Sequence, residues 1–326
     1  MTRMKLGEIY RLAVQAGMAA DIRTKAELQA ELGSQQDRFD KLDKKSKERF
    51  DRDLLWNPYH DSRLLFGEEG KEVGSVLFGI DVSPGEVLLA DRLREKGQAV
   101  DAVIGHHPLG KARGLFPEVL HVQEDMYHAY GVPINVIEDI MAPRVKEIMR
   151  AVHPANFDQP VDAARLLNVP LMCLHSPCDM MGQRFVQRLM DREEPRKVSD
   201  VIDVLMELPE QDLAARRNNA PEVFVGDRGR KAGKVLVKFA GGTAGPKEMY
   251  DALSKAGVGT VVCMHVPDNH IEEARKAHVN VVISGHMASD SIGINLFADV
   301  LEGRGVRVEP FSGLLRVRRG KRVKGE

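Results

Sequence analysis

The sequence predicts a layered α/β fold in which mostly parallel sheets are covered by flanking helices. From residue 75 onward, short apolar runs alternate with longer helical segments, a pattern typical of parallel strands joined by helices. The runs are continuously apolar, as expected of strands buried on both faces. The chain has 326 residues, of which 43% are hydrophobic and 29% charged. This length and composition are ordinary for a globular protein of about two domains.

The first α/β half is expected over residues 71–195. An apolar run at 75–82 leads into Ser83-Pro84-Gly85-Glu86, which has the pattern of a capping box with proline in the first helical position. This helix should end at Gly97, and the run at 102–104 should form the next strand of a βαβ unit. The remaining elements of this half are expected to be helices at 119–130, 142–152 and 161–167 and strands at 134–137 and 171–174.

A charged segment at 191–197 predicts a linker or an exposed turn before a second α/β half, residues 196–326. Strands are expected here at 235–237, 260–264 and 281–284, with helices at 247–255, 269–277 and 292–301. The first strand is followed by Gly241-Gly242-Thr243-Ala244-Gly245-Pro246. This loop could present backbone N–H groups to a phosphate, or it could be a tight structural turn. It does not fit the Walker pattern.

The first 70 residues are expected to form an N-terminal helical extension. Apolar residues at helical spacing predict a helix over 5–18, whereas the stretch from 35 to 53 is polar and highly charged. Such a segment is either a solvated helical face or an arm that packs in an oligomer.

The composition also limits the function and the location of the protein. The net charge of −1 excludes a global field that would hold the chain on nucleic acid or an anionic membrane. The N-terminus lacks the apolar core of a signal peptide, and no run approaches the roughly 18 apolar residues of a membrane span. The chain has only Cys173, Cys178 and Cys263, an odd number that favours a reducing compartment. We therefore expect a cytoplasmic protein.

Histidines follow several of the predicted strands. His106 and His107 come directly after the strand at 102–104. Adjacent residues on an extended segment point in different directions, so this pair suits two neighbouring metal ions better than one. A hydrogen-bonded structural pair is the alternative for an isolated His-His dipeptide.

Two further strands end in a histidine followed four residues later by a carboxylate. The pairs are His175 with Asp179 and His286 with Asp290, and each can offer an imidazole and a hard oxygen ligand. The alternative is helix capping, with Ser176 or Ser289 as the cap and the acid in the first turn. Capping explains each pair alone, but not why three strands end this way. Because ligands bind beyond the carboxyl ends of such strands, we expect the two similar halves to form one metal-binding crevice.

Candidate acid–base residues accompany these ligands. His175 lies within one of the pairs, His265 ends the strand at 260–264, and His270 follows five residues later. The chain contains no Gly-x-Ser-x-Gly elbow and no Gly-x-Gly-x-x-Gly after a strand, which disfavours a serine hydrolase and a dinucleotide-binding fold.

The three strand ends resemble those of the Nif-three-like dinuclear metal-centre family, the GTP cyclohydrolase I type 2 homologs. The resemblance covers about residues 56–305. It includes the Gly241-Gly242 turn and a weaker similarity in the segment 56–67. It implies that two divalent ions per chain are ligated by His106, His107, Asp179, His286 and Asp290, with Asp290 as the bridge. It also implies a ring-shaped homo-oligomer, often a hexamer.

The sequence departs from the family pattern at two places. Asp290 stands where the family usually has Glu, and Cys263-Met264-His265 stands where Thr-Gly-Glu is common. These differences indicate an outlying subfamily.

The ligand set predicts a metal-dependent hydrolase of a small nucleotide-like or phosphorylated substrate. Two cations about 3.5–4 Å apart can activate water and clamp the oxygens of a hydrolysed bond. Mixed imidazole and carboxylate ligands suit zinc, iron, manganese, cobalt or nickel. The alternative is a non-catalytic metal-binding scaffold or regulatory protein, because a fold and a metal do not establish turnover.

Overall fold

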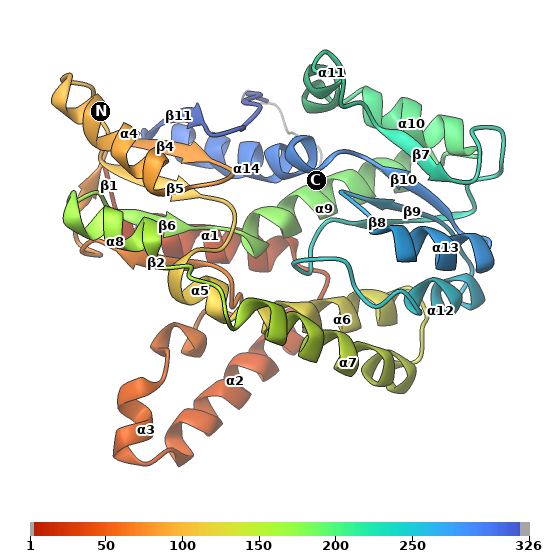
Figure 1. Ribbon diagram of the computed structural model, residues 1–326, viewed down its shortest axis with the longest axis horizontal. Helices are drawn as coiled ribbons and strands as arrows, with labels where there is room; N and C mark the ends of the chain where they lie inside the picture. The colour runs from red at the N-terminus through yellow and green to blue at the C-terminus, as the bar shows by residue number, and fades with distance from the viewer. Residues whose placement is uncertain (1–2, 320–326) are drawn as a thin grey trace.

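The computed structural model describes residues 3–319 and has two main sheets joined by long helices (Figure 1). The first sheet has five strands in the order β11-β4-β5-β6-β2, and only β2 runs antiparallel to its neighbour. These strands are β2 (Arg63–Phe66), β4 (Ser75–Gly79), β5 (Ala102–Gly105), β6 (Leu171–Cys173) and β11 (Arg307–Phe311). The C-terminal strand thus returns to the sheet formed by the first part of the chain.

The second sheet has four strands in the order β7-β10-β9-β8, with β7 antiparallel to β10 and the others parallel. Its strands are β7 (Glu222–Val225), β8 (Lys234–Lys238), β9 (Val258–Cys263) and β10 (Asn280–Ile283). A third, two-stranded sheet pairs β1 (Met4–Lys5) with β3 (Glu72–Val73). The layered, mostly parallel α/β fold predicted from the sequence is confirmed.

Two long helices connect the sheets. Figure 1 shows α9 (Ser176–Glu193) leaving the first sheet toward the second, and α14 (His286–Gly303) leaving the second toward the first. The main hydrophobic core continues through this junction, since it includes Phe78 of β4, Leu236 of β8 and Phe297 of α14. The region where the two sheets meet is therefore held by packing rather than by a flexible linker.

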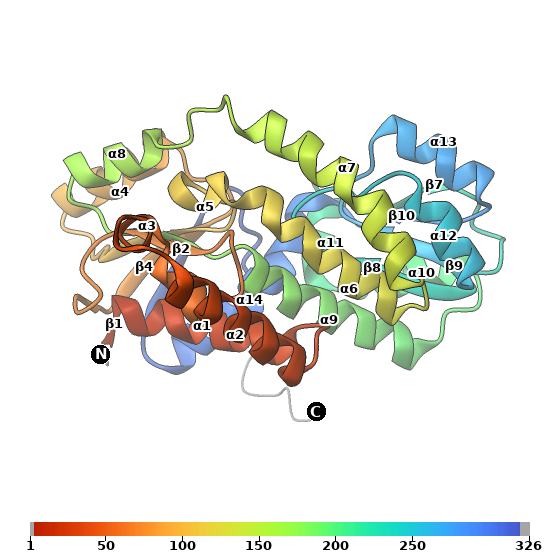
Figure 2. The ribbon, with the colours of Figure 1, turned by 90° about the horizontal axis from the view of Figure 1, so that it is seen from below.

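The other helices cover the sheets or lie across them. Figure 2 shows α1, α6 and α7 on the face turned toward the viewer. Their bounds, with those of the remaining helices and 3-10 turns, are α1 (Leu6–Ala20), α2 (Lys25–Lys41), α3 (Lys44–Arg49), η1 (Arg52–Leu55), α4 (Pro84–Glu95), α5 (Gly110–Gly114), η2 (Phe116–His121), α6 (Val122–Ala129), α7 (Ile134–Val152), α8 (Gln159–Leu166), α10 (Val198–Met206), α11 (Pro209–Ala215), α12 (Met249–Lys255) and α13 (Asp268–Lys276). No helix within residues 3–319 is long and apolar enough to cross a lipid bilayer.

The N-terminal segment divides into a buried and a projecting part. Helix α1 packs against α9 and buries Ile9, Tyr10 and Val14, as its helical spacing predicts. Helices α2 and α3 extend away from the body as a charged hairpin (Figure 1). The first 70 residues also supply β2, an edge strand of the first sheet.

One local prediction is wrong and another is only partly right. The expected strand at 134–137 is the start of α7, because Ile137, Met141 and Val145 recur every four residues and bury one helical face. The linker or exposed turn expected at 191–197 is shorter than predicted, since α9 continues to Glu193 and only residues 194–197 form a non-helical turn before α10.

Candidate metal centre

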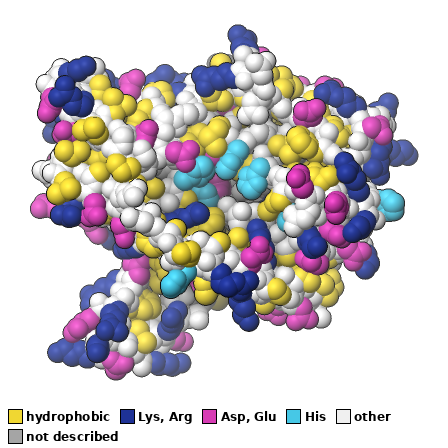
Figure 3. All heavy atoms as spheres, viewed as in Figure 1, with side chains coloured by type: hydrophobic (Ala, Val, Ile, Leu, Met, Phe, Trp, Pro, Cys, Tyr) yellow, Lys and Arg dark blue, Asp and Glu magenta, His cyan; other side chains and the backbone are white. Residues whose placement is uncertain are grey.

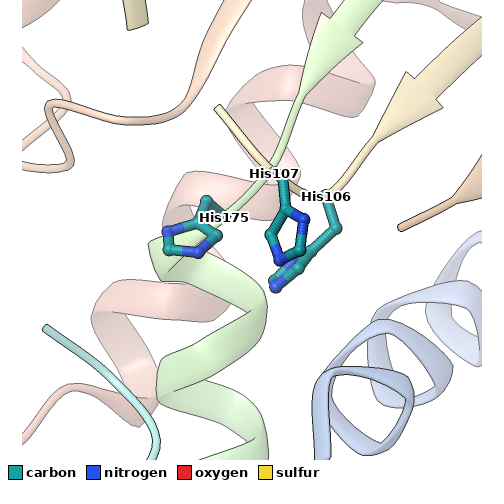
Figure 4. Close-up of side chains that lie close together, drawn as sticks. All are labelled: His106, His107 and His175. Carbon is teal, nitrogen blue, oxygen red and sulfur yellow. The ribbon is translucent and has the colours of Figure 1, made fainter. Parts of the chain in front are cut away.

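The histidines gather in a hollow between the two sheets. In the space-filling view, several histidine side chains form one cluster at the centre of the face (Figure 3). His106 and His107 follow β5, and His175 follows β6 as the N-cap of α9. Figure 4 shows these three rings side by side where the two strands end. Since β5 and β6 are parallel, with Gly105 opposite Cys173, the residues after them meet, and the His106 and His175 ring centroids are 4.7 Å apart.

The second half contributes His286 and Asp290 from the first turns of α14. This helix begins at His286, after Gly285, which adopts a left-handed φ of 82°. In both long helices a His-x-x-x-Asp-x-x-Gly pattern runs from the end of the preceding strand. It extends from His175 to Gly182 in one helix and from His286 to Gly293 in the other.

The two glycines of this pattern allow the helices to approach closely. A Cβ built on Gly182 would lie 3.2 Å from the backbone nitrogen of Gly293, and one on Gly293 would collide with the Cys178 carbonyl. Because each glycine comes three residues after the aspartate, the contact between the helices brings Asp179 and Asp290 to the same place.

Asp290 lies between two groups of ligands. Its Oδ1 is 3.6 Å from His106 Nε2, and its Oδ2 is 3.5 Å from both His107 Nε2 and His286 Nε2. Asp179 Oδ1 lies 3.3 Å from His106 Nε2. One carboxylate thus faces both a His106–Asp179 group and a His107–His286 group.

The polar atoms at this centre fit a bound metal ion. His106 Nε2, Asp179 Oδ1 and both carboxylate oxygens of Asp290 are buried without a hydrogen-bond partner among residues 3–319. Leaving such groups unsatisfied is costly, and a metal ion is one of the few partners that would satisfy them together. Three sets of side chains place their ligand atoms within 4.8 Å of one another, namely His106–His107–His175, His107–His286–Asp290 and His106–Asp179–Asp290. These buried side chains could hold a divalent metal.

The histidine rings are oriented by oxygen acceptors on their far side. The Nδ1 atoms of His106, His107 and His175 lie 3.1, 2.6 and 2.6 Å from Leu174 O, Asp81 Oδ1 and Asp61 Oδ2. These acceptors place the proton on Nδ1 and leave the Nε2 lone pair free toward the centre, an arrangement typical of metal-binding histidines.

The charges of the centre are strongly coupled. Burial opposes charge on His106, but the Asp290 and Asp179 carboxylates hold the pKa of this ring well above its usual value. Burial likewise opposes ionisation of Asp290, yet His106, His107 and His286 lower its pKa. For Asp61, hydrogen bonds from His175 and Ser176 outweigh burial and lower the pKa to about 2.

The three proposed acid–base histidines lie at different distances from the centre. His175 Nε2 is 3.6 Å from Asp179 Oδ2. His265 is exposed at the rim, with its ring centroid 5.0 Å from that of His286. His270 is buried behind it against Tyr250, and burial with Arg144 and Lys238 nearby lowers its pKa to about 4.

The predicted serine caps are wrong, although Asp179 does lie in the first turn of α9. Helix α9 begins at Ser176 and α14 at His286, and neither has a side-chain cap. Ser176 Oγ instead donates to Asp61, and Ser289 Oγ to the Gly285 carbonyl. The expected helix at 292–301 therefore starts six residues earlier, which places Asp290 within it.

Sequence reasoning missed the residues that orient the histidines. Asp81 lies two residues after the end of β4, so the rule that singled out the other strand ends applies to it as well. Asp61 lies in the segment 56–67, but nothing local indicates that it is completely buried beside a residue 114 positions away.

An open cavity of about 530 Å³ adjoins the centre. Its walls include His107, His175, His265 and His286 together with Arg113 and the Gly242–Thr243 loop. Gln123 of α6 holds this loop by donating to the Gly241 and Thr243 carbonyls at 2.7 and 2.8 Å. A narrower cavity of about 50 Å³ continues from it past Lys238 and His270.

The fold and this centre define an α/β protein whose buried histidines and aspartates could bind divalent metal. The chain belongs to the NIF3 superfamily. It is 34% identical to a NIF3 superfamily protein from Sphaerobacter thermophilus, with a TM-score of 0.70 over 78% of this chain and 92% of that one. The predicted resemblance is therefore confirmed.

More distant structures share only a weak likeness. Reduced HcgD from Methanocaldococcus jannaschii is 13% identical over 79% of this chain and 91% of its own, with a TM-score of 0.49. A protein from Thermus thermophilus, TTHA1606, is 15% identical over 78% of this chain and 89% of its own, with a TM-score of 0.44. No protein-family profile and no curated protein matches the chain.

Proposed function

We propose that the protein is a dinuclear metal-dependent hydrolase of a small nucleotide-like or phosphorylated substrate. The observation that carries the proposal is the position of Asp290, whose two buried oxygens face different histidines and have no hydrogen-bond partner. One ion would be held by His106, Asp179 and Asp290, and the other by His107, His286 and Asp290. When bound, the two cations would supply Lewis-acid activation of water and stabilise developing negative charge.

The protein side chains would bind the substrate and exchange protons. The open cavity provides room beside the ligands, and His175 and His265 belong to its wall. A ring nitrogen of either residue can exchange a proton with a group bound there. His270 lines the narrow cavity, and its low pKa keeps the ring neutral at pH 7.

The metal would be one of those that accept mixed nitrogen and oxygen ligands. Imidazole with carboxylate suits zinc, iron, manganese, cobalt or nickel. The shorter Asp290, in place of the Glu usual in the family, places the bridging carboxylate nearer to α14.

We also propose self-association into a homohexamer. Exposed apolar side chains on the neighbouring helices α4 and α8 support it, because Leu88, Leu89 and Leu166 are 51%, 46% and 73% exposed. A cytoplasmic location remains a prediction from the composition.

The test combines metal content with turnover. Protein reconstituted with each candidate metal is analysed for bound metal and then incubated with a panel of nucleotides and phosphate esters. We expect about two ions per chain and hydrolysis that is lost in His107→Ala. His153→Ala, which changes an exposed histidine at the end of α7, is the matched control. Two bound ions without turnover of any panel member would instead support the non-catalytic scaffold.

A further inference from the structure

Lys238 is a partly buried lysine without an acidic partner. It ends β8 beside Cys263 of β9 and lines the narrow cavity. Its Nζ donates to the Thr243 carbonyl at 3.0 Å, and no carboxylate within residues 3–319 forms an ion pair with it. Burial lowers the pKa of Lys238 to about 8. Placing a lysine where its charge is disfavoured has a stability cost, which commonly indicates a functional role.

Arg113 is a second cation of the same kind on the opposite half of the protein. It belongs to α5, and its guanidinium lies over the Phe116 ring, 4.7 Å from the centroid. In the described part of the chain no acidic side chain pairs with it, and burial lowers the pKa of this guanidinium. Stacking on Phe116 leaves its N–H donors available at the edge of the group.

Both cations border one continuous space beside the candidate metal centre. Arg113 lines the open cavity and Lys238 the narrow one. The two cavities share His175, Gly242, Thr243, His265 and His286 as wall residues. The Gly242–Thr243 loop lies next to both cations, because Lys238 donates to the Thr243 carbonyl and the Phe116 ring under Arg113 lies 3.0 Å from the position of a Cβ on Gly242.

The acids that line this space are already engaged by histidines. Asp81 Oδ1 contacts His107 Nδ1, and Asp179 faces His106 and His175. Neither acid forms an ion pair with Arg113 or Lys238 in the described part of the chain, although the nearby Asp179 carboxylate favours the charged form of Lys238. The space thus has two available cations, in addition to whatever charge bound metal would add.

We propose that Arg113 and Lys238 bind a phosphate group of the substrate beside the metal centre. This inference rests on the proposed function, because it assumes that the substrate occupies the same crevice. An arginine edge and a lysine ammonium on different walls suit an anion with several oxygens, such as a phosphate monoester, which accepts hydrogen bonds in more directions than a planar carboxylate.

Binding of inorganic phosphate tests the proposal without requiring turnover. Calorimetry is performed on metal-loaded protein whose metal content is measured in the same sample. We expect Lys238→Met and Arg113→Met each to weaken phosphate binding at least tenfold without loss of metal. Lys238→Arg should retain most of the affinity. Lys146→Met, an exposed position on α7, is the matched control and should bind phosphate normally.

Three outcomes would overturn the proposal. Unchanged phosphate affinity in the Lys238→Met, Arg113→Met double variant would show that the anion contacts only metal. If malonate binds as tightly as phosphate, the site recognises carboxylates equally well and is not a phosphate site. If the native, metal-loaded protein does not bind phosphate, the proposed phosphate site does not exist. None of these depends on hydrolysis, so a failure of the proposed enzymatic activity is recognised separately.

A stability measurement distinguishes a binding role from a structural one. If Lys238 serves ligand binding at the expense of stability, Lys238→Met should melt at a higher temperature than the native protein while binding phosphate less well. A lower melting temperature together with lost binding would indicate that Lys238 is needed for the fold, and would contradict the proposal.

Discussion

Gly182 and Gly293 pack against each other where α9 crosses α14, with the Gly293 nitrogen only 3.2 Å from the position that a Cβ on Gly182 would occupy. Each glycine lies one helical turn beyond an aspartate of the candidate metal centre. The closeness of the two helices therefore determines the separation of Asp179 and Asp290, and a change in packing there should alter metal binding.

Gly293→Ala should destabilise the protein and weaken metal binding. The added methyl group collides with the Cys178 carbonyl, so the helices must move apart. Overpacking of this kind costs about 1–3 kcal/mol in the free energy of unfolding. Urea unfolding and elemental analysis measure the two effects. Gly303→Ala is the matched control in the same helix, because nothing lies within 4 Å of its built Cβ. Equal metal content in both variants would disprove the role of the helix contact.

Asp290→Asn should lose at least one ion, whereas Asp290→Glu should retain both. The amide removes the negative charge shared by His106, His107 and His286, while Glu restores the acid usual in the family. Elemental analysis after dialysis provides the measurement, with circular dichroism to verify the fold. Asp139→Asn, at an exposed position on α7, should change nothing. Two tightly bound ions in Asp290→Asn would refute the bridging assignment.

Asp61→Asn should weaken metal binding without removing a ligand. Asp61 accepts hydrogen bonds from His175 Nδ1 and Ser176 Oγ at 2.6 and 2.7 Å and so orients the start of α9. This segment also carries the candidate ligand Asp179, so displacing it should weaken metal binding, and loss of an outer-shell carboxylate typically reduces metal affinity or activity about 10–100-fold. Competition with a chelator measures the affinity. Asp61→Glu, which keeps the charge but displaces it, should give an intermediate result, and unchanged affinity in both variants would contradict the orienting role.

Titration of Lys238 should make the free energy of unfolding change with pH in the alkaline range. Its pKa is about 8 in the folded protein and about 10.4 when unfolded. Between these values the unfolded chain binds more protons, so raising the pH favours the folded state. The free energy of unfolding should therefore rise by about 1–3 kcal/mol relative to Lys238→Met as the pH passes through this range. Urea unfolding of both proteins at pH values from about 7 to 10 tests this, and parallel curves would contradict it.

Self-association should be visible in solution. Light scattering at micromolar concentration should give a mass near six times the 36.3 kDa of one chain. Leu166→Glu places a charge on the most exposed apolar side chain of α8 and should reduce that mass. A 36.3 kDa monomer for the native protein would contradict the proposed hexamer.

The sequence by itself determined the layered α/β fold, the family and the positions of the candidate ligands. These features are local, since a strand, a histidine after it and an acid four residues later can be recognised within about ten residues. The capping box at Ser83 and the buried strand at 102–104 were predictable for the same reason. Residues 134–137 were not, because so short and mostly apolar a run suits either a strand or the start of a helix, and only the burial of Ile137 with Met141 and Val145 on one face of α7 decided between them.

Only the tertiary structure decided which residues meet. Asp61 reaches His175 because β2 pairs with β6, and Asp81 reaches His107 because β4 pairs with β5. The availability of Lys238 as an unpaired cation likewise depends on which acids lie around it. Such relationships join residues far apart in the chain, and they arise from strand pairing and helix packing, which no short stretch of sequence specifies.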